Sequence, residues 1–123
     1  MQTEQPLDFS FPKGCRIRKH NIYQLLFRKG RRIALPHFVI YYMIRENGAA
    51  RLGTTVSRKV GNAVVRNHCK RQLREFFRSI RHVVIPSLDL SILARPGAAQ
   101  LTSQQVRQEL LEGLQNGALV NLP

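Results

Sequence analysis

Acidic side chains are scarce in this sequence. Seven Asp and Glu stand against twenty Lys and Arg, so the 123-residue chain has a formal net charge of +13. Residues 13–81 hold eighteen Lys and Arg but only two acids, Glu46 and Glu75, and therefore carry +16. A nuclease that acts alone with two metal ions needs several carboxylates around them. The shortage of acids argues against such a centre and favours a polyanion as the binding partner.

Cysteine is scarce, and clustered histidines and long apolar runs are missing. The two cysteines, Cys15 and Cys69, are typical of a reduced intracellular protein. The four histidines have no Cys or carboxylate at metal-ligand spacing, and there is no glycine-rich phosphate loop. The longest apolar run, residues 38–44, is far shorter than the roughly 20 residues that span a bilayer. Residues 1–11 lack the pattern of a secretory signal. We therefore expect a cytoplasmic protein with no metal or catalytic site of its own.

The most informative stretch, residues 62–83, combines a helical apolar pattern with charge of one sign. Its apolar residues fall within an arc of roughly 120° on a helix: Val65, Cys69, Leu73, Phe76, Phe77 and Ile80. A stripe of cations runs beside this arc: Arg66, Lys70, Arg71, Arg74, Arg78 and Arg81. The remaining face holds His68, Gln72, Glu75 and Ser79. A solvated helix face usually mixes both signs, and like charges four residues apart repel. A bound polyanion explains the stripe; the alternative is an ordinary solvated face.

The order of expected elements is α-β-β-β-α-β-α. Strand composition and turn signals place strands at residues 31–35, 37–44, 51–57 and 88–94. Helices are expected at residues 20–29 and 62–83, and after Thr102, which forms a capping box with Gln105. The pattern predicts an α+β or α/β sandwich of one sheet against helices. Of the two we expect the α+β two-layer sandwich with a central four-stranded sheet. We expect an extended or disordered arm at residues 1–13, one RNA-binding domain at 14–117 and a tail at 118–123.

Residues 62–74, Asn-Ala-Val-Val-Arg-Asn-His-Cys-Lys-Arg-Gln-Leu-Arg, resemble the signature of the bacterial ribonuclease P protein subunit family. The likeness extends to residues 16–29, to residues 52–59 ahead of the signature, and to residues 92–102 after it. It covers roughly residues 14–115.

The resemblance implies a protein component of ribonuclease P, the ribonucleoprotein endoribonuclease that removes the 5′ leader of precursor tRNA. In that family an RNA subunit with bound magnesium is the catalyst, and one protein binds one RNA. No cofactor is expected on the protein and no protein residue is expected to be catalytic. The resemblance further implies a ribosomal-S5-domain-2-like fold with an unusual left-handed β-α-β crossover.

Two sets of site residues follow from the resemblance. The contact with the RNA subunit is expected at Arg66, Asn67, His68, Lys70, Arg71, Arg74 and Arg78. The contact with the leader is expected at Tyr23, Phe27, Phe38, Tyr41, Thr55, Ser57, Arg58 and Lys59. Unpaired bases stack on aromatic rings while cations hold the backbone. His68 departs from the family pattern, which has a second Arg there, and Cys69 stands where the family has an aliphatic residue.

Other functional classes are also compatible with a small basic protein. A ribosomal or other structural RNA-binding protein would have the same size and charge but not the signature with its flanks. A metal-dependent nuclease acting alone is disfavoured by the missing carboxylates.

Overall fold

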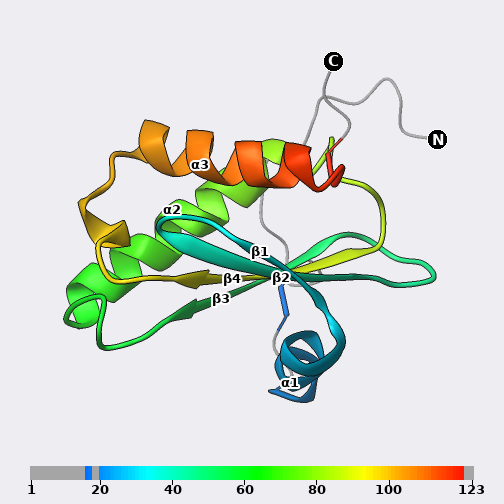
Figure 1. Ribbon diagram of the computed structural model, residues 1–123, viewed down its shortest axis with the longest axis horizontal. Helices are drawn as coiled ribbons and strands as arrows, with labels where there is room; N and C mark the ends of the chain where they lie inside the picture. The colour runs from blue at the N-terminus through cyan, green and yellow to red at the C-terminus, as the bar shows by residue number, and fades with distance from the viewer. Residues whose placement is uncertain (1–15, 18–19, 121–123) are drawn as a thin grey trace.

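The computed structural model describes residues 16–17 and 20–120, and its elements follow the expected order (Figure 1). In chain order these are α1 (His20–Lys29), β1 (Arg31–Ala34), β2 (Phe38–Ile44), β3 (Arg51–Val56), α2 (Ala63–Ile80), β4 (Leu88–Ala94), the 3-10 helix η2 (Ala98–Gln100) and α3 (Ser103–Asn116). The expected arm at residues 1–13 and Cys15 lie outside the described residues. η2 was not predicted.

The four strands form one mixed sheet in the order β1-β2-β4-β3. β1 and β4 each run antiparallel to β2, whereas β3 runs parallel to β4, so α2 makes the crossover between two neighbouring parallel strands. The left-handed sense of this crossover stays a prediction from the family resemblance. α2 and α3 cover one face of the sheet and α1 lies on the other (Figure 1).

The main core lies between the sheet and the α2–α3 layer. Because side chains alternate along a strand, every second residue points into this core. Ile40, Leu90 and Ile92 are fully buried there, opposite Leu73 and Phe77 of α2. Cys69 is also buried, and burial raises the pKa of its thiol, so it acts as a small apolar residue.

α1 packs on the opposite face through Leu26, which is 1% exposed. The chain before α1 adds to the sheet edge: Ile17 donates its N–H to the Leu52 carbonyl at 2.8 Å. Gly30 ends the helix as expected, because its backbone passes so close to the Leu26 carbonyl that a Cβ would lie 2.5 Å from it. α1 is therefore held at both ends, over β3 and over β2.

α2 is shorter than expected at its C-terminus. It begins after Asn62, whose side chain accepts the Val65 N–H at 3.0 Å, but it ends at Ile80 instead of residue 83. Val83 donates to the Ile80 carbonyl in a tight turn, and Val84 then pairs with Val120. Pairing with the C-terminal segment therefore ends the helix.

The neutral face of α2 is a second correction. Gln72, which the sequence places on the remaining face away from the apolar arc, is 9% exposed, and its amide nitrogen donates to the Ser103 hydroxyl of α3 at 3.3 Å. On the same side, Arg107 donates to the Ser79 hydroxyl at 2.6 Å. This face is the polar seam between α2 and α3.

α3 begins with the predicted capping box of Thr102 and Gln105. Val106, Leu110 and Leu114 form its buried side. Packing on the core continues past residue 117, because Leu119 is 2% exposed.

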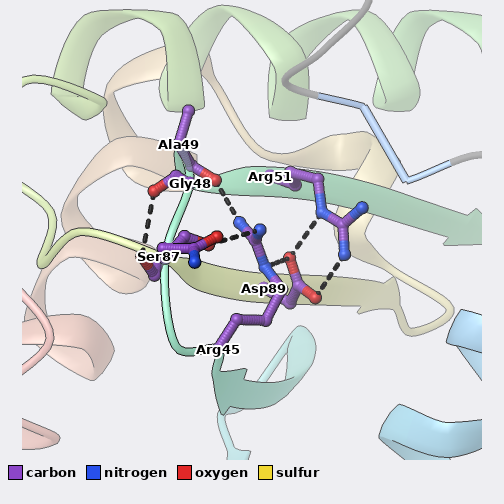
Figure 2. Close-up of polar contacts among 7 residues, drawn as sticks. Arg45, Gly48, Ala49, Arg51, Ser87 and Asp89 are labelled. Atoms are coloured by element: carbon purple, nitrogen blue, oxygen red, sulfur yellow. Dashed lines mark hydrogen bonds and ion pairs between the residues drawn. The ribbon is translucent and has the colours of Figure 1, made fainter.

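A carboxylate with two arginines ties the β2–β3 connection to β4 (Figure 2). Asp89, 4% exposed, accepts from Arg45 Nε at 3.0 Å and from Arg51 Nε and Nη2 at 2.8 and 2.7 Å. Arg45 also donates to the carbonyls of Asn47 and Ala49. Ser87, just before β4, donates to the Gly48 carbonyl at 2.9 Å. The connection is thereby fixed at both of its ends.

Candidate nucleic-acid interface

The cationic stripe of α2 lies on the flank of the helix nearest β3. Arg66, Lys70, Arg74 and Arg78 are half-buried, so their stems pack on the protein. The buried Nε atoms of Arg66 and Arg78 have no hydrogen-bond partner. Asn67 and His68 are exposed at the N-terminal part of the same helix.

Arg71 differs from the other cations of the stripe. Its side chain is 75% exposed and forms an ion pair with Glu75 at 3.2 Å, four residues along the helix. Such an exposed pair stabilises the fold by little, roughly 0.3–0.5 kcal/mol, so Arg71 remains available to a stronger anion.

Lys70 and Arg74 also line a hollow of about 320 Å³ at the β3 edge. Its other walls come from the segment before α1, from α1 and from β3: Arg16, Ile17, Tyr23, Leu52, Gly53 and Thr54. The hollow brings the cations of α2 next to Tyr23, which is far away in sequence. Sequence reasoning did not identify Arg16 as a site residue, because its place depends on the pairing of residue 16 with β3.

Tyr23 is held on β3 by a backbone contact. Its hydroxyl accepts the Thr54 N–H at 3.2 Å, and its ring lies where a Cβ of Gly53 would otherwise be. Burial raises the pKa of the Tyr23 hydroxyl, while the Thr54 N–H acts in the opposite direction. Tyr23 is therefore neutral at physiological pH.

Phe27 and Tyr41 form an aromatic pair between α1 and β2. Their ring centroids are 4.5 Å apart and the planes are tilted by 54°. Phe27 is 44% exposed, so a face or edge of this pair is open to a ligand. Strand register places Tyr41 in the same cross-sheet row as Gly53, through Ser91 of β4. Tyr23, Phe27 and Tyr41 thus lie on one side of the sheet.

The residues after β3 join this side of the sheet to α2. Thr55 is half-buried and points to the same face as Gly53, and Ser57, Arg58 and Lys59 are exposed in the turn that follows. Lys59 donates its N–H to the Ser57 hydroxyl at 3.3 Å.

Phe38 does not belong to this group. Its side chain is 2% exposed and lies in the main core, on the face of the sheet that α2 and α3 cover. The alternation of side chains along β2 explains why the prediction for Phe38 was wrong. Phe38 and Tyr41 are three residues apart and therefore point to opposite faces. A side chain so placed cannot stack on a base.

Within the part of the chain that the structure describes, Asp and Glu pair with few of the cations near this surface. The pairs use His37, Arg45, Arg51 and Arg71. None of them involves Arg66, Lys70 or Arg74. In this part of the chain no group of three His, Cys, Asp or Glu could hold a metal ion. The described helices include none long and apolar enough to cross a membrane.

Comparisons with known proteins point to one family. A profile of the ribonuclease P family matches residues 11–117. The ribonuclease P protein component of Brevibacillus brevis is 38% identical over 109 residues, 88% of this chain and 86% of that protein. The corresponding component of Desulforapulum autotrophicum is 39% identical over 102 residues, 83% of this chain and 87% of that protein.

Solved structures give the same result. The Staphylococcus aureus RNase P protein has a TM-score of 0.80 and 34% identity, covering 89% of this chain and all of the other. The Thermotoga maritima RNase P protein has a TM-score of 0.75 and 30% identity, covering 82% of this chain and 96% of the other. The alternative of a ribosomal or other structural RNA-binding protein is not favoured. The chain belongs to the ribonuclease P protein family, the protein component of the ribonucleoprotein that processes the 5′ end of tRNA.

Proposed function

We propose that α2 binds the catalytic RNA of ribonuclease P and that the α1 side of the sheet binds the 5′ leader of precursor tRNA. The observation that carries this proposal is the hollow at the β3 edge, where Lys70 and Arg74 lie beside Tyr23. There, phosphate-binding cations and a base-stacking ring lie within one site.

The contact with the RNA subunit uses Arg66, Asn67, His68, Lys70, Arg71, Arg74 and Arg78. The guanidinium group of an arginine binds a phosphate through two parallel hydrogen bonds, whereas the ammonium group of a lysine acts as a point charge. The half-buried stems support this role, because they restrict the side chains before RNA binds.

The contact with the leader uses Tyr23, Phe27, Tyr41, Thr55, Ser57, Arg58 and Lys59. The tilted Phe27–Tyr41 pair offers a stacking surface, and the exposed cations after β3 can follow the sugar-phosphate backbone. Phe38 has no part in this contact.

The hydrolysis itself is assigned to the RNA subunit and its magnesium ions, in the cytoplasm, with one protein on each RNA. The protein residues bind and orient RNA, and lower the magnesium concentration that the complex needs, because their charges replace part of the counterion atmosphere.

The test is cleavage of precursor tRNA at low magnesium by the catalytic RNA, with and without the protein. We expect stimulation by the protein and no cleavage by the protein alone. Lys70→Ala should lower the affinity for the catalytic RNA. It should also reduce the magnitude of the salt slope, the slope of log affinity against log salt concentration, by about one.

The matched control is Arg107→Ala, because Arg107 is an exposed cation on α3 that contacts Ser79 away from the stripe. Its salt slope should equal that of the wild type. Absence of stimulation would favour a structural RNA-binding role, and cleavage by the protein alone would favour an independent nuclease.

A further inference from the structure

Arg32 lies beside the aromatic pair, in a position that neither proposed contact includes. β1 is the edge strand of the sheet, and its register places Arg32 opposite Tyr41. Residues directly opposite in antiparallel strands point to the same face. Arg32 therefore shares a face with Tyr41, whose ring contacts Phe27.

The hydrogen-bond pattern brings these two side chains close together. The Leu35 N–H donates to the Phe38 carbonyl at 2.8 Å, which makes Leu35–Phe38 a hydrogen-bonded pair. Such pairs alternate with non-hydrogen-bonded ones, so Arg32–Tyr41 is a non-hydrogen-bonded pair, in which side chains are closer. By the same alternation, the N–H groups of Arg32 and Ala34 point outward at the free edge of β1.

Arg32 has no acidic partner within the described chain. It is exposed, and no ion pair there includes it. Among residues of the four strands the one acid is Asp89, which is already bonded to Arg45 and Arg51. The guanidinium of Arg32 and the outward N–H groups are thus free donors beside an aromatic surface.

The register also gives a line across the sheet. One row runs from Gly53 through Ser91 and Tyr41 to Arg32. Tyr23 packs on Gly53 at one end, and Phe27 packs on Tyr41 near the other. Three strand spacings make this row about 14 Å long. The next group after the aromatic pair, towards the β1 edge, is Arg32.

We propose that Arg32 binds a backbone phosphate of the single-stranded leader where it passes the Phe27–Tyr41 pair and leaves the sheet over β1. This rests on the proposed leader contact and predicts that Arg32 adds affinity only for leaders long enough to reach the β1 edge. Arg32 is a positioning and specificity residue and takes no part in the chemistry.

The test uses the reconstituted holoenzyme and precursor tRNAs whose leaders are lengthened from a single nucleotide upward. For substrates with long leaders, Arg32→Ala should weaken affinity at least about ten-fold, the loss of one charge-assisted hydrogen bond. Its salt slope should also fall in magnitude by about one. Affinity for the single-nucleotide leader should not change, and Arg32→Lys should keep the salt slope.

The matched control is Arg31→Ala. Arg31 is also an exposed cation and precedes Arg32 in the chain, but it is opposite Tyr42 and points to the other face. It should leave the dependence on leader length unchanged. Equal effects of the two variants would mean a general field of charge and would overturn the assignment.

The remaining outcomes separate the two proposals. If wild-type holoenzyme shows no gain with leader length, the proposed leader contact itself fails. If the gain is present and Arg32→Ala retains it, the assignment of Arg32 alone is overturned. If Arg32→Ala weakens binding of the catalytic RNA and all leaders equally, the phosphate belongs to the catalytic RNA, which also overturns it.

Discussion

Tyr23 depends on the absence of a side chain at Gly53. A Cβ at this position would lie 2.5 Å from the Tyr23 hydroxyl oxygen and 2.6–2.7 Å from two ring carbons. Such contacts are shorter than any that packing tolerates, so either the ring or the strand must move. A backbone detail of β3 thus decides where an aromatic residue of α1 lies.

Gly53→Ala should lower the free energy of unfolding by about 1–3 kcal/mol, as expected for overpacking. Urea unfolding gives this value. The control is the same substitution in a Tyr23→Ala background, where the ring is gone and most of the cost should vanish. Equal costs in both backgrounds would show that the strand, and not the ring, resists the methyl group.

His68 is the residue where charge can be added to the α2 surface with least disturbance. It is exposed and lies near Arg71, so a longer side chain has room. His68→Arg should tighten binding of the catalytic RNA modestly and steepen the salt slope by up to about one. Binding measured between low and moderate salt tests this. An unchanged slope would mean that position 68 does not face a phosphate.

At the scale of the elements, Asp89 links β4 to the β2–β3 connection, because its carboxylate binds an arginine at each end of that connection. Asp89→Asn should destabilise the fold by about 2–3 kcal/mol, since two arginines lose their anion. The value lies below that of a wholly buried pair, because the Arg45 and Arg51 side chains are 27% and 24% exposed.

Urea unfolding gives the measurement for Asp89→Asn, and Glu112→Gln on the exposed side of α3 is the control. Affinity for the catalytic RNA should change little at temperatures where the variant stays folded. A loss of stability below about 0.5 kcal/mol would show that the cluster is only a surface ion pair.

Most elements could be predicted from sequence because their signals are local. The bounds of α1 and β4 coincide with the predictions, and so does the capping box of α3. The end of α2 and the burial of Gln72 could not be predicted, since both depend on segments more than 30 residues away. Local pattern carries no information on what packs against a polar face.

The candidate site was only partly predictable for the same reason. Spacing along α2 placed its cations on one flank. Tyr23 and Phe27 lie on the α1 side of the sheet, which their sequence could not show. The face of the sheet to which Phe38 points depends on which alternate residues of β2 face the core. The positions of Arg16 and Arg32 depend on which strands pair. The roles of all these residues in RNA binding remain predictions.

At the scale of the whole molecule, charge is divided along the chain. Residues 13–81 carry +16, and the rest of the chain is acidic by three charges. Self-repulsion in the basic part opposes the compact state. Bound RNA should therefore raise the free energy of unfolding of the protein.

Millimolar pyrophosphate, as a probe of phosphate binding, should raise the melting temperature of the free protein by about 5 °C when it reaches roughly ten times its dissociation constant. Chloride at matched ionic strength is the control for screening. Combined Lys70→Ala and Arg74→Ala should reduce the rise. An equal rise with chloride would mean that screening, and not binding, relieves the repulsion.

The strand order has a consequence for synthesis on the ribosome. β4 lies between β2 and β3 and forms ladders with both, yet it follows them and α2 in the chain. A nascent chain that ends before Leu88 therefore contains the whole cationic helix. Without β4, however, it cannot join the β1–β2 hairpin and β3 into one sheet. Non-local pairing of this kind forms late. The native sheet, which brings the aromatic pair of α1 and β2 into one molecule with the cations of α2, becomes available only after β4 has emerged.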